Sequence, residues 1–237
     1  MDSMNTTGYI HSHETFGTLD GPGVRYVLFL QGCKLRCKYC HNPDAWATCG
    51  GKAVTVDEAM ADILRYRNFI RSGGVTFSGG EPLLQADFVR AMCEACRKEG
   101  LHTAIDTSGA VALEHCHAAV DAADLILLDI KAMDPEMCRE LTGQDNANAF
   151  RLLEYCEETG KDVWVRQVIV PGYTLDKAQV RALHEHCAKF KCVKKVTLLP
   201  FHKLGMYKWE KLGTPSPLAN VREVTATEMD ELNAGSL

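Results

Sequence analysis

Three cysteines lie close together near the start of the chain, at Cys33, Cys37 and Cys40 in the segment CKLRCKYC. Thiolates are soft ligands that bind zinc, copper(I) or iron–sulfur clusters. A closed zinc site needs four ligands, and Cys49 or His41 could supply the fourth. Alternatively, the three cysteines hold three irons of a [4Fe–4S] cluster and leave the fourth iron open to a small molecule. The spacing alone leaves both alternatives open.

The rest of the sequence predicts the elements that position these thiols. Short apolar or β-branched segments predict six strands, at residues 25–30, 74–77, 101–106, 125–130, 163–170 and 193–200. The segments between them have helical spacing. The clearest helix begins at Thr55, where Thr55 and Glu58 form a capping box, and its apolar residues recur as far as Ile70. Further helices are predicted at residues 85–99, 148–159 and 176–189.

Strands that alternate with helices predict βαβ units and a mainly parallel sheet. We expect an α/β fold with one domain over residues 1–237 and a core at about 20–213. Six units favour a partial (β/α)6 barrel that is open on one side, with the site at the C-terminal mouth. The unusual polar and glycine-rich segments support this placement because they follow the predicted strands: QGCKLRC, SGGEP, DTSG, DIKAMD, VPGY and PFHKLG.

Two of these segments together resemble the radical S-adenosylmethionine enzymes. The C-x3-C-x2-C spacing has an aromatic residue, Tyr39, before its last cysteine, and residues 78–81, SGGE, are similar to the GGE motif of that superfamily. The resemblance implies a [4Fe–4S] cluster on Cys33, Cys37 and Cys40, with S-adenosylmethionine bound at the open iron. Reduction of the cluster would then release methionine and a 5′-deoxyadenosyl radical. No catalytic residue is expected beyond the cluster and the cofactor.

The segment GTLDGPGVRYVLFLQGC, residues 17–33, is similar to the G-T-x-D-G-P-G-x-R signature of the glycyl-radical-enzyme activases, and further matches extend to about residue 213. Only Cys49 lies between residues 41 and 78, where several activases carry eight additional cysteines. This favours the branch of the family that acts on pyruvate formate-lyase under anaerobic conditions, in anaerobic glucose metabolism. Three alternatives remain: an activase of another glycyl radical enzyme, a radical enzyme for a small molecule, and a non-enzymatic zinc or iron–sulfur module.

The resemblance also implies roles for individual residues. The expected S-adenosylmethionine contacts are Tyr39, Gly79, Gly80, Glu81, Asp106, Lys131 and His202. A monovalent cation would be held by the side chains of Asp106 and Asp129 and the main-chain oxygens of Thr107 and Leu127. Asp20 and Arg166 resemble a pair that receives the protein substrate. The residues alone also allow plainer explanations, since a buried aspartate or arginine is often part of an internal ion pair.

Composition limits the partners and the compartment. The net charge of −5 argues against a nucleic-acid binder, and the longest apolar runs are too short to span a membrane. The N-terminus shows no secretion signal, so the eleven cysteines are expected to be reduced thiols in the cytoplasm, without a structural disulfide. We expect a monomer that receives electrons from flavodoxin or ferredoxin. A basic patch of Lys34, Arg36 and Lys38 is predicted to guide that donor.

Other clusters look less informative. Cys93 and Cys96 lie in a predicted helix, and we expect them to pack in the core as small hydrophobic residues. The segments 114–117 and 184–187 carry neighbouring His, Glu and Cys residues, which point in different directions on a helix. Residues 227–237 differ from the family pattern, so no packing is predicted for them. His11 and His13 have no assigned role.

Overall fold

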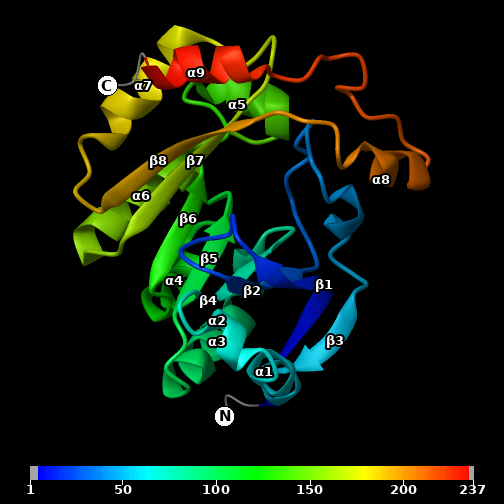
Figure 1. Ribbon diagram of the computed structural model, residues 1–237, viewed down its shortest axis with the longest axis vertical. Helices are drawn as coiled ribbons and strands as arrows, with labels where there is room; N and C mark the ends of the chain where they lie inside the picture. Colours follow the sequence, from blue (N-terminus) through cyan, green and yellow to red (C-terminus); the bar gives the residue numbers. More distant parts are fainter. Residues whose placement is uncertain (1–4, 235–237) are drawn as a thin grey trace. The chain divides into compact units, whose positions relative to one another are not determined.

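The computed structural model describes residues 5–234. Residues 1–4 and 235–237 lie outside the described part. The N-terminal segment in which no secretion signal is predicted begins among the first of these residues, and the C-terminal tail ends among the last. The strands are β1 (Thr7–Gly17), β2 (Arg25–Leu30), β3 (Lys52–Thr55), β4 (Gly74–Gly79), β5 (Thr103–Thr107), β6 (Leu125–Asp129), β7 (Val163–Ile169) and β8 (Val193–Pro200) (Figure 1). The helices are α1 (Val56–Leu64), α2 (Arg67–Ile70), α3 (Ala86–Lys98), α4 (His117–Ala122), α5 (Pro135–Thr142), α6 (Ala147–Thr159), α7 (Lys177–Cys187), α8 (Met206–Lys211) and α9 (Ala226–Ala234).

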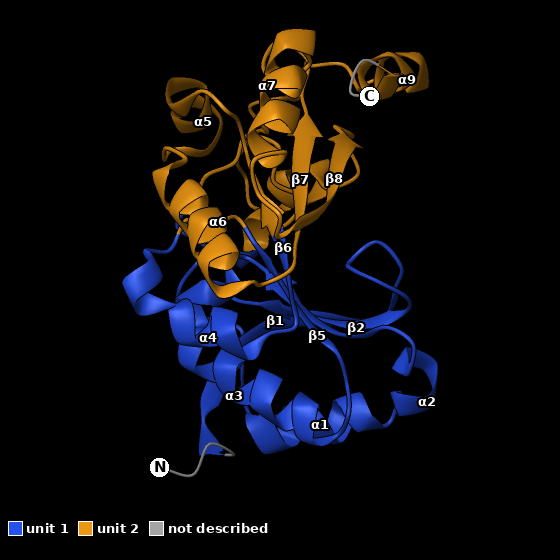
Figure 2. Ribbon diagram, turned by 90° about the vertical axis from the view of Figure 1, so that its left-hand side faces the viewer, with its two compact units in different colours: residues 1–34, 45–107, 111–127 blue, residues 35–44, 108–110, 128–237 orange. Residues whose placement is uncertain are grey.

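Across the described part of the chain, the strands are hydrogen-bonded in the order β3-β1-β2-β4-β5-β6-β7-β8. The pairs β2–β4, β4–β5 and β7–β8 are parallel, whereas β1 pairs antiparallel with both β2 and β3. The parallel α/β organisation predicted from the sequence is therefore confirmed. The chain forms two compact units, shown in Figure 2: unit 1 comprises residues 1–34, 45–107 and 111–127, and unit 2 comprises residues 35–44, 108–110 and 128–237. The assignment of residues 1–237 to one domain stays a prediction.

The helices of unit 1 pack against strands of the same unit, which precede Asp124 in the sequence. Helix α1 begins at Thr55, whose hydroxyl accepts from the Glu58 amide while the Glu58 carboxylate accepts from the Thr55 amide, so the predicted capping box is confirmed. Helix α3 packs against α1 and α4, and Phe88, Met92 and Cys96 of its buried face are at most 2% exposed. Figure 2 shows these helices gathered on one side of the unit 1 strands.

Unit 2 contains the parallel pair β7–β8, and helices α7 and α9 pack against β8. Strand β7 alternates buried and half-buried residues, so Gln167 lies on the opposite face from Arg166. Helix α6 ends at Gly160 in the left-handed region (φ 68°), and α7 begins at Asp176, whose carboxylate accepts from the Gln179 amide. Both ends were predicted from the sequence, because glycine favours the left-handed C-cap and aspartate the N-cap.

Two features differ from the prediction. Strands β1 and β3 were not expected, because β1 is largely polar with little apolar alternation and β3 has only four residues. The helix from Thr55 was expected to reach Ile70, but α1 ends at Leu64, where the Arg65 amide bonds back to the carbonyl of Asp62 at 3.2 Å. A new turn then leads into α2, and Ile70 is buried from there. The apolar spacing therefore marked a buried face that two helices share.

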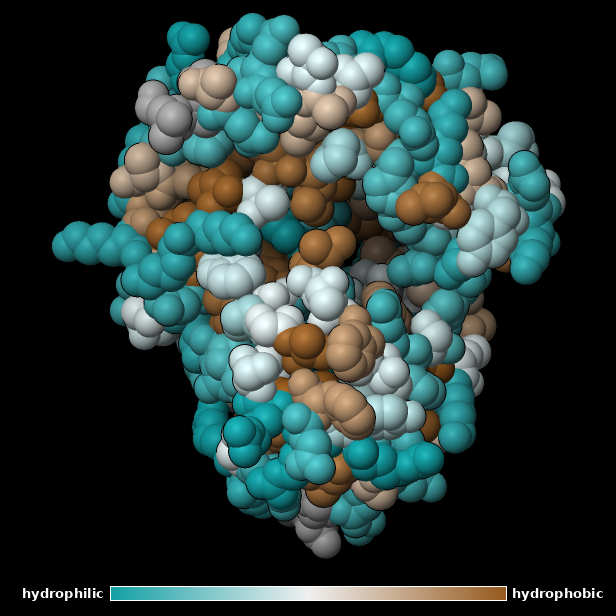
Figure 3. All heavy atoms as spheres, viewed as in Figure 1, coloured by the Kyte–Doolittle hydropathy of each residue, from teal (hydrophilic) through white to brown (hydrophobic). Residues whose placement is uncertain are grey.

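The surface is mostly polar. On the face seen in Figure 3, hydrophobic atoms occur in small groups among hydrophilic ones. The exposed large hydrophobic residues of the described part are Tyr9, Phe16, Leu19, Phe69, Leu204, Tyr207 and Leu212. Within residues 5–234, no helix is long and apolar enough to cross a bilayer.

Candidate active site

The site residues predicted from the sequence fall into both units. Unit 1 contains Cys33, the SGGE segment, Asp106, Thr107, Leu127 and Asp20, and unit 2 contains Cys37, Tyr39, Cys40, Asp129, Lys131, Arg166 and His202. All eleven cysteines lie within residues 5–234, and none of them is part of a disulfide in the structure.

In unit 1, the chain before Cys33 is fixed by its own neighbours. The Gly32 amide donates to the carbonyl of Ala45 at 2.8 Å, and the Cys33 amide donates to the carbonyl of Trp46 at 3.2 Å. The side-chain amide of Gln31 donates to the carbonyl of Ala47 at 2.8 Å. Cys33 is 8% exposed at the end of this braced segment. Its position is therefore set by backbone hydrogen bonds and does not depend on the thiol.

The glycines of the SGGE segment are required by close backbone packing. A Cβ on Gly79 would lie 2.3 Å from the amide nitrogen of Leu30, and a Cβ on Gly80 would lie 2.2 Å from the carbonyl oxygen of Gly32. The Gly80 amide donates to Leu30 O at 2.9 Å, and the Glu81 amide donates to Gly32 O at 2.8 Å. The segment is thus locked to the end of β2, immediately before Cys33. The absence of a Cβ at Gly79 and Gly80 therefore makes room for the protein's own backbone.

Two hydroxyl groups orient the carboxylates of unit 1. Thr107 Oγ1 donates to Glu81 Oε1 at 2.6 Å, and Glu81 is 1% exposed. Ser78 Oγ donates to Asp106 Oδ2 at 2.8 Å. Ser78 was not singled out from the sequence, although it directly precedes the two glycines at the end of a buried strand. The two hydroxyls therefore help to set the orientation of these carboxylates.

In unit 2, the loop that carries Cys37 is attached to the last turn of α5. The Arg36 amide donates to the carbonyl of Thr142 at 2.7 Å, and the Lys38 amide donates to the carbonyl of Leu141 at 2.9 Å. These carbonyls are among those that a helix leaves unpaired at its C-terminus. The cysteine loop therefore caps α5, and α5 in turn holds the loop on both sides of Cys37.

Helix α5 is well defined by its own sequence. Asp134 is its N-cap and accepts from the Met137 amide at 2.7 Å, Pro135 occupies the first turn, and Gly143 ends it in the left-handed region (φ 84°). Proline at the start and glycine after the end are the residues expected at these positions. The helix was nevertheless not predicted, because it is short and has few apolar residues.

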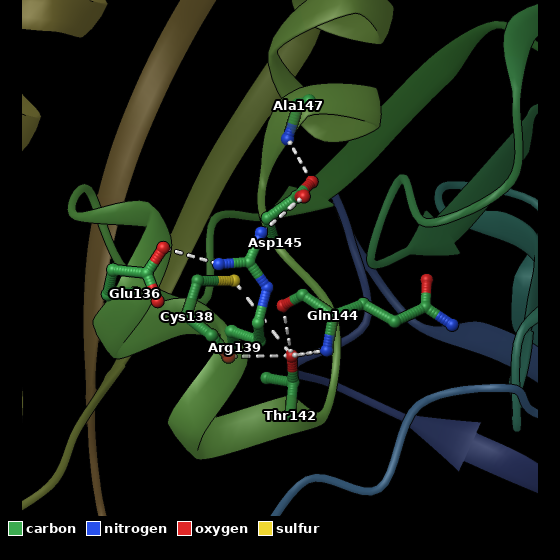
Figure 4. A network of polar contacts seen from close by, with 7 residues as sticks. All are labelled: Glu136, Cys138, Arg139, Thr142, Gln144, Asp145 and Ala147. Carbon is green, nitrogen blue, oxygen red and sulfur yellow. Dashed lines mark hydrogen bonds and ion pairs between the residues drawn. The ribbon is translucent and has the colours of Figure 1, made fainter.

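A network of polar contacts fixes the C-terminal end of α5 (Figure 4). Thr142 Oγ1 lies 2.8 Å from the carbonyl oxygen of Cys138 and 2.9 Å from that of Gln144. Arg139 forms ion pairs with Glu136 and with Asp145, the latter at 2.9 Å. The turn after α5 is therefore tied to the helix, and this rigidifies the carbonyls that hold the cysteine loop.

The C-terminal segment holds the other end of the cysteine loop. Trp209 Nε1 donates to the carbonyl of Cys40 at 2.8 Å, and Lys208 Nζ donates to Asn42 Oδ1 at 2.7 Å and pairs with Asp44 Oδ2 at 3.1 Å. Trp209 is 4% exposed. The segments YCHN and KWEKLG, which are far apart in the sequence, thus meet in one unit, with α8 acting as the clamp.

The rings of His202 and His41 pack against each other in the same region, tilted by 35°. Their ring centroids are 4.3 Å apart, and His41 Nε2 is 3.2 Å from the carbonyl oxygen of His202. Burial lowers the pKa of His41, and the neighbouring histidine contributes in the same direction, while the hydrogen bond to the carbonyl opposes them. A Cβ on Gly205 would lie 2.6 Å from His41 Cα, so the chain after His202 passes directly over the cysteine loop. His202 Nδ1 is buried and has no hydrogen-bond partner in the described structure.

Tyr39 and Lys131 lie beside Cys37. Tyr39 is 8% exposed, and its hydroxyl has no hydrogen-bond partner in the described structure. Lys131 Nζ is 5.8 Å from the centroid of the tyrosine ring. Burial raises the pKa of the Cys37 thiol to about 12, although the charge of Lys131 opposes the shift. Burial likewise raises the pKa of Tyr39, which therefore stays a phenol at neutral pH.

Asp129, at the end of β6, accepts from two cations. Its Oδ2 is 2.9 Å from Lys131 Nζ, its Oδ1 is 2.8 Å from Arg166 Nε, and the three side chains are 13–16% exposed. Burial alone would raise the pKa of Asp129, but the charges of Arg166 and Lys131 outweigh it and lower the pKa below its usual value. Burial alone would lower the pKa of Lys131, but Asp129 raises it well above its usual value. The internal ion pair considered for Asp129 and Arg166 is therefore present.

This triad joins residues that the sequence assigned to different tasks: Lys131 to the cofactor, Arg166 to the protein substrate and Asp129 to a cation. Asp129 and Lys131 also line an open pocket with an empty volume of about 250 Å³. The other lining residues are Leu35, Ser108, Ala110, Cys138, Thr142, Asp145, Asn146 and Ala149. The remaining members of the expected cation site, Asp106, Thr107 and Leu127, belong to unit 1.

Not every part of the predicted basic patch is available for a partner. Lys34 and Arg36 are exposed, but Lys38 Nζ pairs with Glu140 at 3.0 Å and donates to the Tyr173 hydroxyl at 3.0 Å. These contacts raise the pKa of Lys38. Lys38 thus serves to attach the cysteine loop to its own unit.

The other cysteine and histidine clusters can now be compared with their predicted roles. Cys93 and Cys96 are both fully buried in α3, which confirms the prediction of core packing. The residues at 114–117 include an exposed histidine beside the buried Cys116, so they do not converge. In α7, His186 packs against the rings of Phe150 and Phe190, at 4.8 and 5.2 Å between centroids.

The donor set fits the cofactors that the sequence suggests. Three thiols within eight residues are the soft ligands that an iron–sulfur cluster requires, and the chain between them is too short to separate them widely. The buried hydroxyl of Tyr39 and the buried Nδ1 of His202 each lack a partner, as expected where a polar molecule such as S-adenosylmethionine binds. The charged Lys131 can donate to a carboxylate or a ribose.

Comparison with known proteins shows the family to which the chain belongs. Residues 27–183 match the Radical SAM superfamily. The chain is 41% identical over 233 residues to pyruvate formate-lyase 1-activating enzyme of Escherichia coli K12, covering 97% of this chain and 95% of that one. It is 38% identical over 234 residues to pyruvate formate-lyase-activating enzyme of Streptococcus mutans, covering 95% of this chain and 89% of that one.

A solved structure supports the fold. The crystal structure of Streptococcus suis SuiB bound to precursor peptide SuiA matches 86% of this chain and 43% of that one, with a TM-score of 0.66 and 18% identity. At that identity the likeness concerns the fold alone, and it agrees with the partial barrel expected from six βα units. The matched family residues include the C-x3-C-x2-C loop and the SGGE segment. The chain therefore belongs to the radical SAM superfamily and, within it, to the family of the pyruvate formate-lyase-activating enzymes.

Proposed function

We propose that this protein activates pyruvate formate-lyase by taking a hydrogen atom from a glycine Cα of that enzyme. The observation that carries the proposal is the 41% identity over 97% of the chain to a pyruvate formate-lyase-activating enzyme. The three cysteines, the SGGE segment and the GTLDGPGVR segment all lie within this matched length. The interval between residues 41 and 78 has the single cysteine expected of this branch.

The cluster ligands in this proposal are Cys33, Cys37 and Cys40. When bound, the [4Fe–4S] cluster and S-adenosylmethionine supply the 5′-deoxyadenosyl radical that abstracts the hydrogen atom. The chain's own contribution is to hold the thiols and the cofactor in place and to exclude water. The last turn of α5 and the indole of Trp209 hold the cysteine loop at both ends.

The cofactor contacts in this proposal are Tyr39, Gly79, Gly80, Glu81, Asp106, Lys131 and His202. Lys131 is charged and oriented by Asp129, which suits a donor to the cofactor's carboxylate. A monovalent cation would use oxygens of Asp106, Thr107, Leu127 and Asp129. A carboxylate has several lone pairs, so Asp129 retains acceptor capacity beside its two cationic partners.

Asp20 and Arg166 are proposed to receive the glycine-containing segment of the partner. Arg166 donates through Nε to Asp129, and a guanidinium is a planar group of N–H donors that suits the carbonyl and carboxylate oxygens of a peptide. Glycine suits the reaction because it has no side chain to block the approach of the radical. We further propose that the protein acts as a monomer in the cytoplasm and receives electrons from flavodoxin or ferredoxin.

The test is electron paramagnetic resonance of the partner. Anaerobically reconstituted protein, reduced and mixed with S-adenosylmethionine and pyruvate formate-lyase, should produce a glycyl radical doublet. Cys37→Ala should abolish the doublet by removing a cluster ligand. Cys93→Ala is the matched control, since it removes a buried thiol of α3 away from the proposed ligands, and it should leave the doublet nearly intact.

Three outcomes would contradict the proposal. Colourless protein with one zinc per chain would favour the metal module considered above. Release of 5′-deoxyadenosine without a glycyl doublet would indicate another substrate, either a different glycyl radical enzyme or a small molecule. A folded Cys37→Ala protein that still forms the doublet would show that the ligand assignment is wrong.

A further inference from the structure

The C-terminal ends of β4 and β5 are joined by side chains as well as by their backbones. The parallel register of the two strands includes the pair Phe77–Ile105. One position further along, Ser78 Oγ donates to Asp106 Oδ2 at 2.8 Å. Ser78 is 7% exposed, so water competes little for this hydrogen bond. The serine hydroxyl therefore ties the end of β4 to the carboxylate at the end of β5.

A second hydrogen bond joins the same strand ends in the opposite direction. Thr107, the last residue of β5, donates through Oγ1 to Glu81 Oε1 at 2.6 Å. The same carboxylate oxygen accepts from the Leu83 amide at 3.1 Å, so that Glu81 caps the short 3₁₀ helix Pro82–Gln85. Thr107 is 2% exposed and Glu81 is 1% exposed. The donor of the first bond thus comes from β4, and the donor of the second comes from β5.

The two hydrogen bonds leave β5 on opposite faces. Asp106 and Thr107 are consecutive strand residues, and consecutive side chains of a strand point to opposite faces. A strand end that is tied on both faces cannot turn about its own axis without breaking one of the two bonds. We call the pair of bonds, Ser78–Asp106 and Thr107–Glu81, the β4–β5 brace.

The brace also holds the main chain of the SGGE segment. The Gly80 amide donates to Leu30 O, and the Glu81 amide donates to Gly32 O, so the backbone of the segment is bound to the end of β2. The side chain of Glu81 binds the same segment to β5 through the brace. The SGGE segment and Asp106, which are distant in the sequence, therefore share one support within unit 1.

We propose that Ser78 and Thr107 are positioning residues for S-adenosylmethionine, because the brace holds Asp106 and the SGGE segment in the arrangement that binds its methionine moiety. This rests on the cofactor contacts given in the proposed function. The amino group of the methionine moiety is a cation with N–H donors, which carboxylate and main-chain oxygens accept. Acceptors that are held in place before binding lose less conformational freedom, and they therefore bind more tightly.

The main variant is Thr107→Val, which keeps the β-branched shape and the main-chain oxygen and removes the hydroxyl. The dissociation constant of S-adenosylmethionine, measured by equilibrium dialysis with anaerobically reconstituted protein, should rise about tenfold, which corresponds to about 1.4 kcal/mol. The iron content should not change. 5′-Methylthioadenosine, which lacks the amino and carboxylate groups, should bind the variant as it binds the wild type. Thr107→Ser restores the hydroxyl and should restore the affinity for S-adenosylmethionine.

The second variant, Ser78→Ala, removes the other hydroxyl and should raise the same dissociation constant about fivefold. It carries the test if Thr107→Val does not fold. If the two bonds act as one brace, the loss of either loosens the same strand ends, and the double variant should bind more tightly than the product of the two single factors predicts. A rise equal to that product would show two independent hydroxyls and would overturn the brace.

The matched control is Thr103→Val, which removes a buried hydroxyl from the other end of β5. Thr103 is 1% exposed, and its hydroxyl donates to Asp124 Oδ2 at 2.9 Å. Like Thr107→Val, it takes one donor from a carboxylate, so both variants should lower the melting temperature comparably. Only Thr107→Val should weaken S-adenosylmethionine binding. An equal loss of affinity in both variants would overturn the proposal, since general destabilisation would then explain it.

Hydrogen exchange gives a readout that does not depend on the cofactor. In reconstituted protein before S-adenosylmethionine is added, a peptide spanning residues 78–85 contains the hydrogen-bonded amides of Gly80 and Glu81. Its exchange should be about five times faster in Thr107→Val than in wild type, because the brace no longer holds the segment. Thr103→Val should exchange at the wild-type rate in this peptide. An unchanged rate in Thr107→Val would contradict the role of the brace.

Asp106→Ala distinguishes a failure of this inference from a failure of the proposed contacts. If Asp106→Ala weakens S-adenosylmethionine binding while folded Thr107→Val and Ser78→Ala proteins bind it like the wild type, the brace is not a positioning device and the contact stands. If Asp106→Ala binds S-adenosylmethionine with wild-type affinity, the proposed contact is wrong, and the inference drawn from it is wrong as well.

Discussion

Replacement of Asp129 by asparagine removes the one negative charge from the buried group that it forms with Lys131 and Arg166. Asparagine keeps the shape of the side chain, so the effect is electrostatic. Asp129 accepts two hydrogen bonds from charged groups, at 2.8 and 2.9 Å; the asparagine oxygen can keep one of them, whereas its NH2 group cannot accept the other. Loss of one hydrogen bond to a charged group costs about 1.5–3 kcal/mol. Breaking a buried ion pair from one side costs about 3–5 kcal/mol, so the two figures agree on roughly 3 kcal/mol.

The assay is urea unfolding of the reduced, cluster-free protein at several pH values. The pKa of Asp129 is lowered in the folded state, so its carboxylate stabilises the fold above the unfolded-state pKa of about 4. That stability is lost as the pH falls through the folded-state pKa. The difference between wild type and Asp129→Asn should therefore be largest near neutral pH and shrink below about pH 4. Asp162→Asn is the control, since its ion pair with Lys194 at 3.4 Å is about half exposed and should matter far less.

The same variant has a functional consequence. Because Asp129 orients both Lys131 and Arg166, its loss should weaken S-adenosylmethionine binding and raise the Michaelis constant for the protein substrate together. A free energy of unfolding within 1 kcal/mol of wild type at pH 7, or a difference that grows below pH 4, would refute the reasoning from the ion-pair geometry.

Three further predictions follow from the cysteine loop and its surroundings. Trp209→Phe should lower the free energy of unfolding by about 1 kcal/mol by leaving the carbonyl of Cys40 unpaired, measured by urea unfolding; no change would mean that water replaces the indole. Gly80→Ala should lower the free energy of unfolding by about 1–3 kcal/mol, measured by thermal unfolding, since its Cβ would lie 2.2 Å from the main-chain oxygen of Gly32. An unchanged free energy of unfolding would show that the backbone moves to accommodate the methyl group. Reversal of Lys34 and Arg36 to glutamate should slow cluster reduction by flavodoxin roughly tenfold at low salt and spare reduction by dithionite, and equal rates would remove the basic-patch hypothesis.

The sequence predicted the parallel strands well because each is a short run rich in apolar or β-branched residues. The strands at Arg25–Leu30 and Val193–Pro200 have the predicted bounds, and helix ends marked by Asp176 and Gly160 were also correct. Local chemistry decides such features, so a single sequence reveals them. Strands β1 and β3 could not be recognised in this way, because they are ordered by antiparallel pairing with distant residues.

In the candidate site too, some features are decided by the local sequence and others by residues that are distant in the sequence. The cysteines and the SGGE segment were recognisable because each forms a short motif of characteristic residue types and spacing. The supports of the site were not: Ser78 beside Asp106, the hydroxyl of Thr107 beside Glu81 and Trp209 on Cys40 become visible only in three dimensions. An ordinary serine, threonine or tryptophan carries no signal by itself, since its role depends on the group that the fold places opposite.

The contacts between α8 and the cysteine loop have a consequence for the order of synthesis, folding and cluster loading. The contact of Trp209 with Cys40 joins residues 169 positions apart, and that of Lys208 with Asn42 joins residues 166 apart. During synthesis the N-terminal part of the chain emerges first, so the cysteines leave the ribosome long before their clamp exists. Until α8 has been synthesised, the cysteine loop lacks its contacts with Trp209 and Lys208. We expect its thiols to be more accessible to oxidants and to other metal ions at that stage. We therefore expect cluster loading to follow the synthesis of α8, and chains that end before residue 206 to retain less iron when they are reconstituted.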